Sequence, residues 1–314
     1  MRNKKLKRLI SPALLLLAAM IWGFAFTAQS KAESVPPFTL GAVRSIFAFV
    51  FLIFAVIIFD KVNNTNRRLI RFCQKKIKVD VNAGEILGGI ILGIILALAS
   101  FFQQAGINMG ADPGKAAFIT ALYVVLVPIY ALFIRRRAPI NVWISVAIAA
   151  IGFYLLCIKG DFSIAKEDIF VLVCSLIFPI HILTIDFFLP KCDGIRMSMI
   201  QFLSCGITNI TLALIFERGT DITLILSAIL PLLYLGVCSS GIAYTLQIIG
   251  QKGVNPAAAS VIMSLESVFG VLGSALLIGT QMSGREYIGC AVVFVAVILS
   301  QIDFTILFEK EIKK

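Results

Sequence analysis

The stretch QIIGQKGVNPAAASVIMSLESV, residues 247–268, has a partner earlier in the chain. It aligns without gaps on QAGINMGADPGKAAFITALYVV, residues 104–125. The matched apolar residues mean little, because apolar segments resemble one another by composition, but matched Gln, Gly and Pro residues at fixed spacing indicate an internal repeat. These pairs are Gln104 and Gln247, Gly110 and Gly253, and Pro113 and Pro256. A glycine followed by a proline at the first turn of the next helix is typical of a tight helical hairpin, so each copy predicts one.

The rest of the chain is strongly apolar. Of its 314 residues, 59% are hydrophobic and 14% are charged, which is too apolar for a soluble protein. Runs of about 20 apolar residues, the length of helix that crosses ~30 Å of hydrocarbon, recur along it. We expect ten spans, at 10–29, 38–59, 84–109, 115–134, 140–158, 168–189, 197–216, 224–249, 256–278 and 286–305. The predicted fold class is an all-α polytopic membrane protein with ten transmembrane helices.

Basic residues indicate the orientation of these spans. Most of the 28 Lys and Arg fall in alternate loops and in the two terminal segments, and such residues collect on the cytoplasmic side. Both termini are therefore expected in the cytoplasm. The net charge of +11 is then a feature of membrane topology that favours an anionic lipid surface, and no nucleic-acid partner is expected.

The repeat has a consequence for symmetry. An offset of 143 residues carries the fourth span onto the ninth, so the repeat unit has five spans, 1–160 and 161–314. Because five is odd, the second copy crosses the bilayer in the opposite sense. Inverted repeats are typical of secondary transporters, in which the substrate binds between the halves and each half closes one side in turn.

Several short motifs resemble the EamA-type members of the drug/metabolite transporter superfamily. They are AAMIWGFAF at 18–26, PPFTLGAVRSIFAF at 36–49, the two hairpins and the order of the spans. The resemblance implies a ten-helix bundle with a central cavity. It also implies a multi-pass plasma-membrane protein that exports a small metabolite, amino acid or drug-like solute by exchange or coupled to a proton or another ion. The sixth span, with LIFPIHILTID at 176–186, departs from the Trp22-Gly23 motif of the first, so a symmetric site is not expected.

Ionisable residues inside the spans are the first candidates for a substrate pathway, because burying one in a bilayer costs about 2.5–3.5 kcal/mol. Glu266 is expected near the midplane, where it could bind a cationic group or carry a proton, or could instead fix helix packing. The repeat aligns it with Tyr123. Arg44 could bind an anionic group, or its side chain could instead extend toward the outer lipid headgroups. His181, the only histidine, could titrate near neutral pH or serve as a hydrogen-bonded structural residue.

Uncharged polar and aromatic residues complete the set. Trp22 lies too deep for an interfacial residue and could line the cavity or pack between helices. Gln104 and Gln247, matched by the repeat, lie on polar lines of their spans, as does Tyr244, and such side chains need partners in lipid. The candidate pathway residues are Trp22, Arg44, Gln104, Tyr123, His181, Tyr244, Gln247 and Glu266.

Other classes of protein are less compatible with this sequence. A membrane enzyme acting on a lipid or isoprenoid needs an acid/base pair or metal cluster, and the chain has one histidine and no DDxxD, HxxxD or HExxH motif. A channel usually has a symmetric pore or a charged ring. The sequence contains no P-loop motif, which argues against ATP-driven transport by this chain. The scattered cysteines indicate neither a metal site nor a disulfide framework. No catalytic residue, metal or cofactor is therefore expected.

Overall fold

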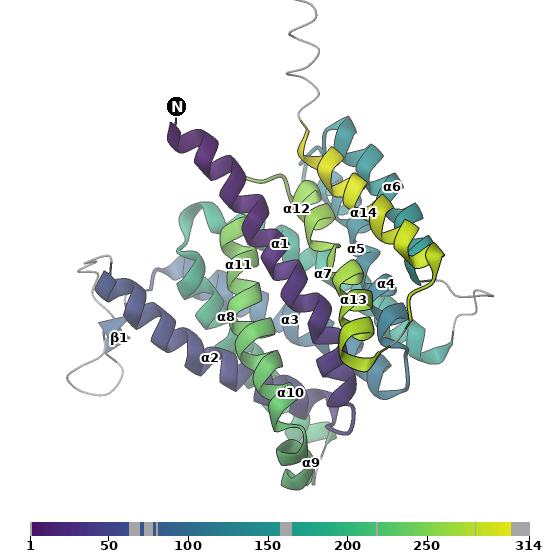
Figure 1. Ribbon diagram of the computed structural model, residues 1–314. Coiled ribbons are helices and arrows are strands. Elements are labelled where there is room, and N and C mark those ends of the chain that lie inside the picture. The colour runs from purple at the N-terminus through teal and green to yellow at the C-terminus, as the bar shows by residue number, and fades with distance from the viewer. Residues whose placement is uncertain are drawn as a thin grey trace, which may run out of the picture.

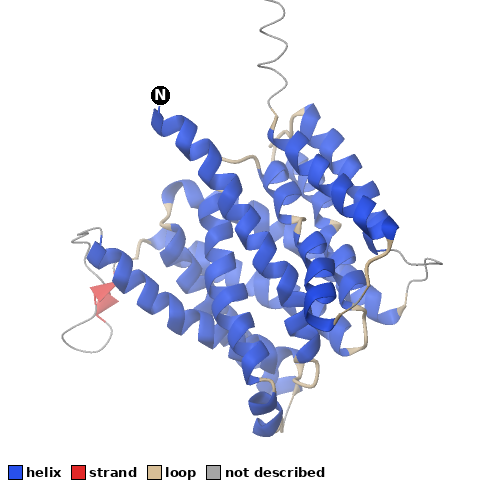
Figure 2. Ribbon diagram, viewed as in Figure 1, coloured by secondary structure: helices blue, strands red, loops and turns tan. Residues whose placement is uncertain are grey.

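The chain folds as a bundle of helices (Figures 1 and 2). The computed structural model describes residues 2–62, 70–71, 78–79, 81–157, 165–217, 219–279 and 281–302. The expected basic tail at 303–314 and most of the expected cytoplasmic loop between the second and third spans lie outside these residues. In the described part of the chain, the one strand pairing is a short antiparallel ribbon of β1 (Ile70–Arg71) and β2 (Lys78–Val79).

The helices fall into two halves of the sequence. The first half, residues 2–157, contains α1 (Arg2–Lys31), α2 (Pro37–Val62), α3 (Ala83–Asn108), α4 (Pro113–Ala121), α5 (Tyr123–Phe133) and α6 (Ile140–Cys157). The second half, residues 165–302, begins with α7 (Lys166–Phe188), the 3₁₀ turn η1 (Leu189–Lys191) and α8 (Gly194–Phe216). It continues with α9 (Ile222–Ser227), α10 (Ile229–Leu233), the π-helix η2 (Tyr234–Ala243) and α11 (Tyr244–Gly250). Its last helices are α12 (Pro256–Met263), α13 (Glu266–Ile278) and α14 (Gly284–Gln301).

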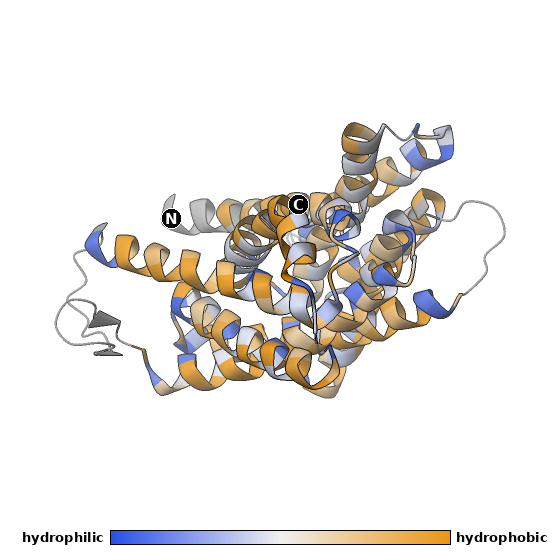
Figure 3. Cartoon of the chain, turned by 90° about the horizontal axis from the view of Figure 1, so that it is seen from below, coloured by the Kyte–Doolittle hydropathy of each residue, from blue (hydrophilic) through white to orange (hydrophobic). Residues whose placement is uncertain are grey.

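Length and hydropathy identify a polytopic membrane protein. Among the described residues, nine helical segments are long and apolar enough to cross a bilayer, while α6 is apolar but shorter. Large hydrophobic side chains are exposed on the outside of the bundle, such as Phe133, Phe187 and Leu276. Figure 3 shows hydrophobic residues in orange along most helices. An apolar surface of this extent is explained by contact with lipid.

The two predicted hairpins are confirmed. Gly110 and Gly253 adopt positive φ angles of 101° and 82°, which an L residue rarely tolerates. Each hairpin continues with a proline at the start of the next helix, as the sequence predicts, and the structure adds a side-chain N-cap before it. The residues concerned are Asp112 and Pro113 for α4, and Asn255 and Pro256 for α12.

Both helices that follow these hairpins are interrupted at equivalent positions. The α-helix is interrupted at Leu122, between α4 and α5, and at Ser264 and Leu265, between α12 and α13. Tyr123 and Glu266, which the sequence repeat aligns, are the first residues of the segments that follow. The interruptions therefore obey the same 143-residue offset as the sequence copies.

The two ends of the chain lie on one face of the bundle. Figure 1 shows the start of α1 and the end of α14 at the upper side, and α9 at the opposite side. This arrangement agrees with termini on one side of the membrane. Which side is cytoplasmic stays a prediction from the basic residues.

Cysteine labelling tests the orientation. In a background with the native cysteines replaced by serine, Glu33→Cys is expected to react with an impermeant maleimide added to intact cells, and Arg137→Cys only after permeabilisation. Both positions are exposed and lie in loops on opposite faces. The reversed pattern would contradict the orientation derived from the basic residues.

Candidate functional site

A cavity lies in the centre of the bundle between the two halves of the sequence. The first half contributes Trp22, Ala25, Phe26, Gln29, Arg44, Gln103, Thr120 and Tyr123. The second half contributes Phe178, Ile182, Ser239, Tyr244, Gln247, Met263 and Glu266. The centres of water molecules can occupy about 40 Å³ of this cavity, which is room for only a few waters.

Glu266 supplies a buried carboxylate to the cavity. It is the first residue of α13, directly after the interruption of the helix, and a carboxylate in the first turn of a helix lies at the favourable end of the helix dipole. Its side chain is 6% exposed, and its Oε1 has no hydrogen-bond partner among the residues that the structure describes. The Tyr123 hydroxyl lies within hydrogen-bonding reach of the carboxylate, and Tyr244 lines the same cavity. This carboxylate can therefore accept a cationic group or a proton.

Arg44 supplies a buried guanidinium from α2. Its Nε donates to Ser240 Oγ at 2.9 Å, and its Nη2 donates to Ser239 Oγ at 3.2 Å. Two of the five N–H donors of the guanidinium are thereby satisfied. No Asp or Glu of the described ranges forms an ion pair with Arg44. The remaining donors are available to an anionic ligand in the cavity.

The two serines that hold Arg44 lie in the π-helix η2. A π-helix of ten residues is rare, because π-helical geometry is usually limited to single-turn bulges, which are frequent at functional sites. Trp22 donates from its indole Nε1 to the Ser239 carbonyl at 3.1 Å. The π-helix is thus bonded to α1 and α2 at the cavity wall.

Two aromatic rings, those of Trp22 and Tyr244, line the cavity together with the two charged groups. The Tyr244 ring packs edge-on against Trp22, with centroids 4.8 Å apart. Tyr244 lines the same cavity as Arg44 and Glu266. These rings can cover an apolar or cationic part of a ligand that lies between the charges.

Gly23 explains how Trp22 and Glu266 come to share one cavity. A side chain at this position would collide with Phe269 and with the Glu266 carbonyl, so α1 and α13 pack closely only because the residue is glycine. The Trp22-Gly23 pair of the first span therefore has a structural role as well as a place in the cavity wall.

The structure places most of the candidate pathway residues together. Those that line the cavity are Trp22, Arg44, Tyr123, Tyr244, Gln247 and Glu266. His181 lies behind Tyr244, is fully buried, and has its Nε2 3.1 Å from Gln201 Oε1. Gln104 is not among the lining residues, and its Nε2 donates to Asn108 Oδ1 at 2.7 Å and to the carbonyl of the lining residue Gln29 at 3.4 Å.

Several lining residues were not among the candidates. Gln103, the neighbour of Gln104, lines the cavity and donates to Thr120 Oγ1 at 3.1 Å. The polar line on this span contains both glutamines. The sequence therefore identified the polar face of the helix but selected Gln104 in place of the lining residue Gln103. Ser239 could not have been found, because single serines occur throughout apolar helices and hydrogen-bond to their own backbone.

Comparisons with known proteins agree with this architecture. A curated relative named "Uncharacterized transporter", from Archaeoglobus fulgidus, is 27% identical over 295 residues, which cover 93% of this chain and 86% of the relative. A solved structure described only as "Crystal structure of protein" is similar with a TM-score of 0.72 and 18% identity, and the match covers 92% of this chain and 96% of the other. The EamA-like transporter family model matches residues 9–158 and again residues 165–301. These two matches include nearly all of the described residues, and the chain belongs to the EamA-like transporter family.

Proposed function

We propose that this chain is a secondary transporter that exports a small zwitterionic organic solute across the plasma membrane by alternating access. The observation that carries the proposal is a pair of buried, opposite charges, Arg44 and Glu266, that face one cavity from different halves of the chain without an ion-pair partner in the described residues. A solute with one carboxylate and one ammonium group would neutralise both. An α-amino acid is the simplest solute of this class.

The architecture that we propose has ten spans arranged as two inverted five-helix repeats, with α6 as the fifth span and both termini in the cytoplasm. Two observations support it. The interruptions of the two hairpin helices obey the same offset as the sequence copies. The family match also falls into two parts, one in each half. Inverted repeats with interrupted helices at the site are typical of alternating-access transporters.

Each end of the solute has a group that suits it. The guanidinium of Arg44 can donate to both oxygens of a carboxylate, an interaction that is stronger than one between neutral groups. The Glu266 carboxylate suits an ammonium group, and Trp22 and Tyr244 can cover the carbon skeleton between them. In the present conformation the cavity has room for only a few waters, so the two halves must separate before a solute can enter.

Coupling to a proton follows from the same carboxylate. Glu266 can be neutralised by one cation at a time, either a proton or the ammonium group of the solute. If the transporter carries the solute outward with Glu266 deprotonated and returns empty with Glu266 protonated, each solute exported is exchanged for one proton. A proton gradient directed inward would then drive export.

Ligand-dependent thermal stability tests the proposed substrate class. An α-amino acid that binds the cavity must stabilise the folded protein, by about 2.7 kcal/mol at a hundred times its Kd. The corresponding amine without the carboxylate, and the N-acetylated acid without the ammonium charge, are expected to stabilise much less. The measurement is the unfolding temperature of purified protein across a panel of such matched triplets. Stabilisation of equal size by all three members of every active triplet would contradict recognition of both charges.

A further inference from the structure

Helices α2 and α8 connect the two halves along their whole length. They pack against each other in opposite directions, because the end of α2 meets the start of α8 and the start of α2 meets the end of α8. α2 carries Arg44, and a residue of α8, Gln201, contacts His181 behind the cavity wall. Separation of α2 from α8 at one end of the pair would have to break the contact at that end.

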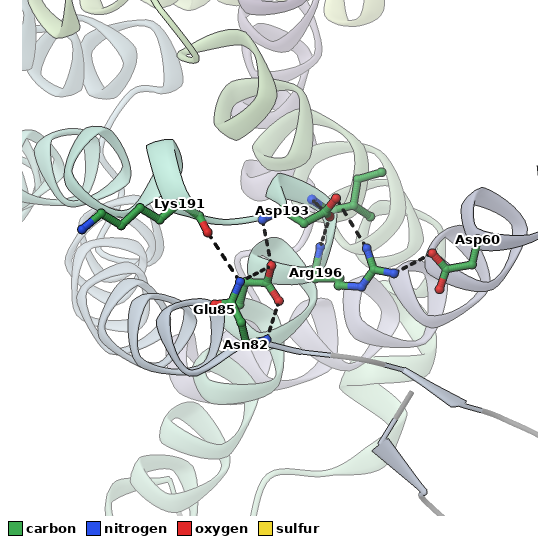
Figure 4. Close-up of polar contacts among 7 residues, drawn as sticks. Asp60, Asn82, Glu85, Lys191, Asp193 and Arg196 are labelled. Carbon is green, nitrogen blue, oxygen red and sulfur yellow. Dashed lines mark hydrogen bonds and ion pairs between the residues drawn. The ribbon is translucent and has the colours of Figure 1, made fainter. Parts of the chain in front are cut away.

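At one end, an ion pair holds the helices together (Figure 4). Arg196, in the first turn of α8, donates from Nη2 to Asp60 Oδ1 in the last turn of α2 at 2.5 Å. Both side chains are largely buried, with 4% and 10% exposed. Arg196 also pairs with Asp193 at 3.4 Å, and the backbone N–H of Asp193 donates to Glu85 Oε1 of α3 at 2.9 Å.

At the other end, a carboxylate holds the start of α2. Glu217, which follows the last residue of α8, accepts from the backbone N–H groups of Phe38 and Thr39 at 2.7 Å each. It also accepts from the Thr39 hydroxyl at 2.9 Å. The carboxylate satisfies N–H groups that the first turn of a helix leaves without partners, and it lies at the favourable end of the helix dipole.

The two contacts are equivalent under the inverted arrangement of the halves. Asp60 lies 23 residues after Pro37, the first residue of α2, and Glu217 lies 23 residues after Gly194, the first residue of α8. Their partners correspond as well, since Thr39 and Arg196 each occupy the third position of their helix. At each end of the pair, the acidic residue 23 positions after the first residue of one helix thus bonds to the start of the other helix.

We propose that these two contacts are the gates of the cavity: the Asp60 gate, formed by Asp60 and Arg196, and the Glu217 gate, formed by Glu217 and the start of α2. Each must break for the cavity to open at its own end, while the intact contact at the other end acts as the hinge. This inference rests on the proposed alternating-access function. Both gates are closed in the present structure, in agreement with the small volume of the cavity.

The two gates differ in chemistry although they are equivalent in position. The Asp60 gate is a buried ion pair whose arginine is joined to Asp193 and, through it, to Glu85. The Glu217 gate is a single carboxylate bonded to a helix terminus and to one hydroxyl. Removal of one partner of a buried ion pair leaves an uncompensated charge, so the Asp60 gate is expected to be the more sensitive to substitution.

Hydrogen exchange of the whole protein in nanodiscs, followed by mass spectrometry, tests the gates without any solute. In Asp60→Asn, residues 54–62 and 194–199 and the cavity-lining segment 234–247 are expected to exchange at least roughly ten-fold faster than in the parent. Residues 37–42 at the other end should stay protected. Arg196→Gln, which removes the other partner, is expected to give the same exchange pattern. Asp60→Glu, which keeps the ion pair, is expected to give the exchange pattern of the parent.

The mirror experiment uses Glu217→Gln. Here residues 37–42 and the same cavity-lining segment are expected to exchange faster, while residues 54–62 stay protected. Asp221→Asn is the matched control, because Asp221 is close in sequence but its side chain bonds, among the described residues, to Thr223 of its own turn. It should change exchange in that turn alone.

Two results would overturn the proposal. Faster exchange at both ends in Asp60→Asn would mean that the ion pair stabilises the fold as a whole. Faster exchange at one end without any change in residues 234–247 would mean that the contact frays without opening the cavity. Neither result would affect the proposed transport function, which is tested by solute binding and flux.

Discussion

Replacement of Glu266 by glutamine is expected to abolish export of zwitterionic solutes while the protein still folds and reaches the membrane. Glutamine keeps the size of the side chain and can still hydrogen-bond, but it removes the negative charge and the titration. An interaction with a charged partner contributes about 1.5–3 kcal/mol, so the affinity for an ammonium-bearing solute should fall roughly ten- to hundred-fold. Proton-coupled flux should disappear altogether, since no other carboxylate lines the cavity in the described part of the chain.

Flux into or out of proteoliposomes, at mildly acidic and mildly alkaline pH, measures this effect. Glu33→Gln is the matched control, because it makes the same change in an exposed loop residue. The control should keep the parental flux and pH response. If the Glu266 variant also kept both, with normal unfolding temperature, the carboxylate would be present for helix packing and the proposed coupling would be wrong.

The sequence predicted the helices well because their main determinant is local. A run of apolar residues long enough to cross the bilayer must be helical, since every backbone group has to be satisfied without water. The interruptions at Leu122 and Leu265 could not be predicted. Neither position carries the Gly or Pro that usually marks a break, so the interruption arises from packing between helices that are distant in sequence.

The π-helix η2 was likewise beyond prediction from the sequence. Its ten residues are apolar or small, and nothing in their pattern distinguishes a π-helix from an α-helix. Its stability comes from tertiary contacts, such as the Trp22 indole bonded to the Ser239 carbonyl. The sequence therefore indicated the eighth span but not the irregular geometry that brings two serines to Arg44.

For the cavity, charge was the most informative property. Glu266 and Arg44 could be predicted because an ionisable residue inside a span is costly unless it faces the interior. The choice between Gln103 and Gln104 could not be made from the sequence, because neighbouring residues point in directions about 100° apart on a helix and both lay on the predicted polar face. The repeat favoured Gln104, the partner of Gln247, but the cavity is lined by Gln103 and Gln247 and not by Gln104.

Replacement of Arg44 by glutamine is expected to weaken recognition of the carboxylate end of the solute, as Glu266→Gln weakens recognition of its ammonium end. Affinity for zwitterionic solutes should fall roughly ten- to hundred-fold, because the carboxylate loses a charged, bidentate donor. Affinity for the matched amine, which has no carboxylate, should stay at the parental value. Arg44→Lys keeps the charge but not the planar pair of donors, so it should recover only part of the affinity. The measurement is the Kd of each solute by thermal shift or calorimetry.

The amine separates a binding role of Arg44 from a structural one. Arg44 also bonds to Ser239 and Ser240, so its removal could loosen the contact between α2 and the π-helix. A loosened contact would weaken the binding of amine and zwitterion alike, whereas loss of an anion site weakens only the zwitterion. In the double variant that combines Arg44→Gln with Glu266→Gln, the two losses of binding free energy for the zwitterion should add if each residue binds a different end of the solute. Equal loss for amine and zwitterion in Arg44→Gln would show that Arg44 orders the cavity wall, and the carboxylate site would then have to be sought elsewhere on that wall.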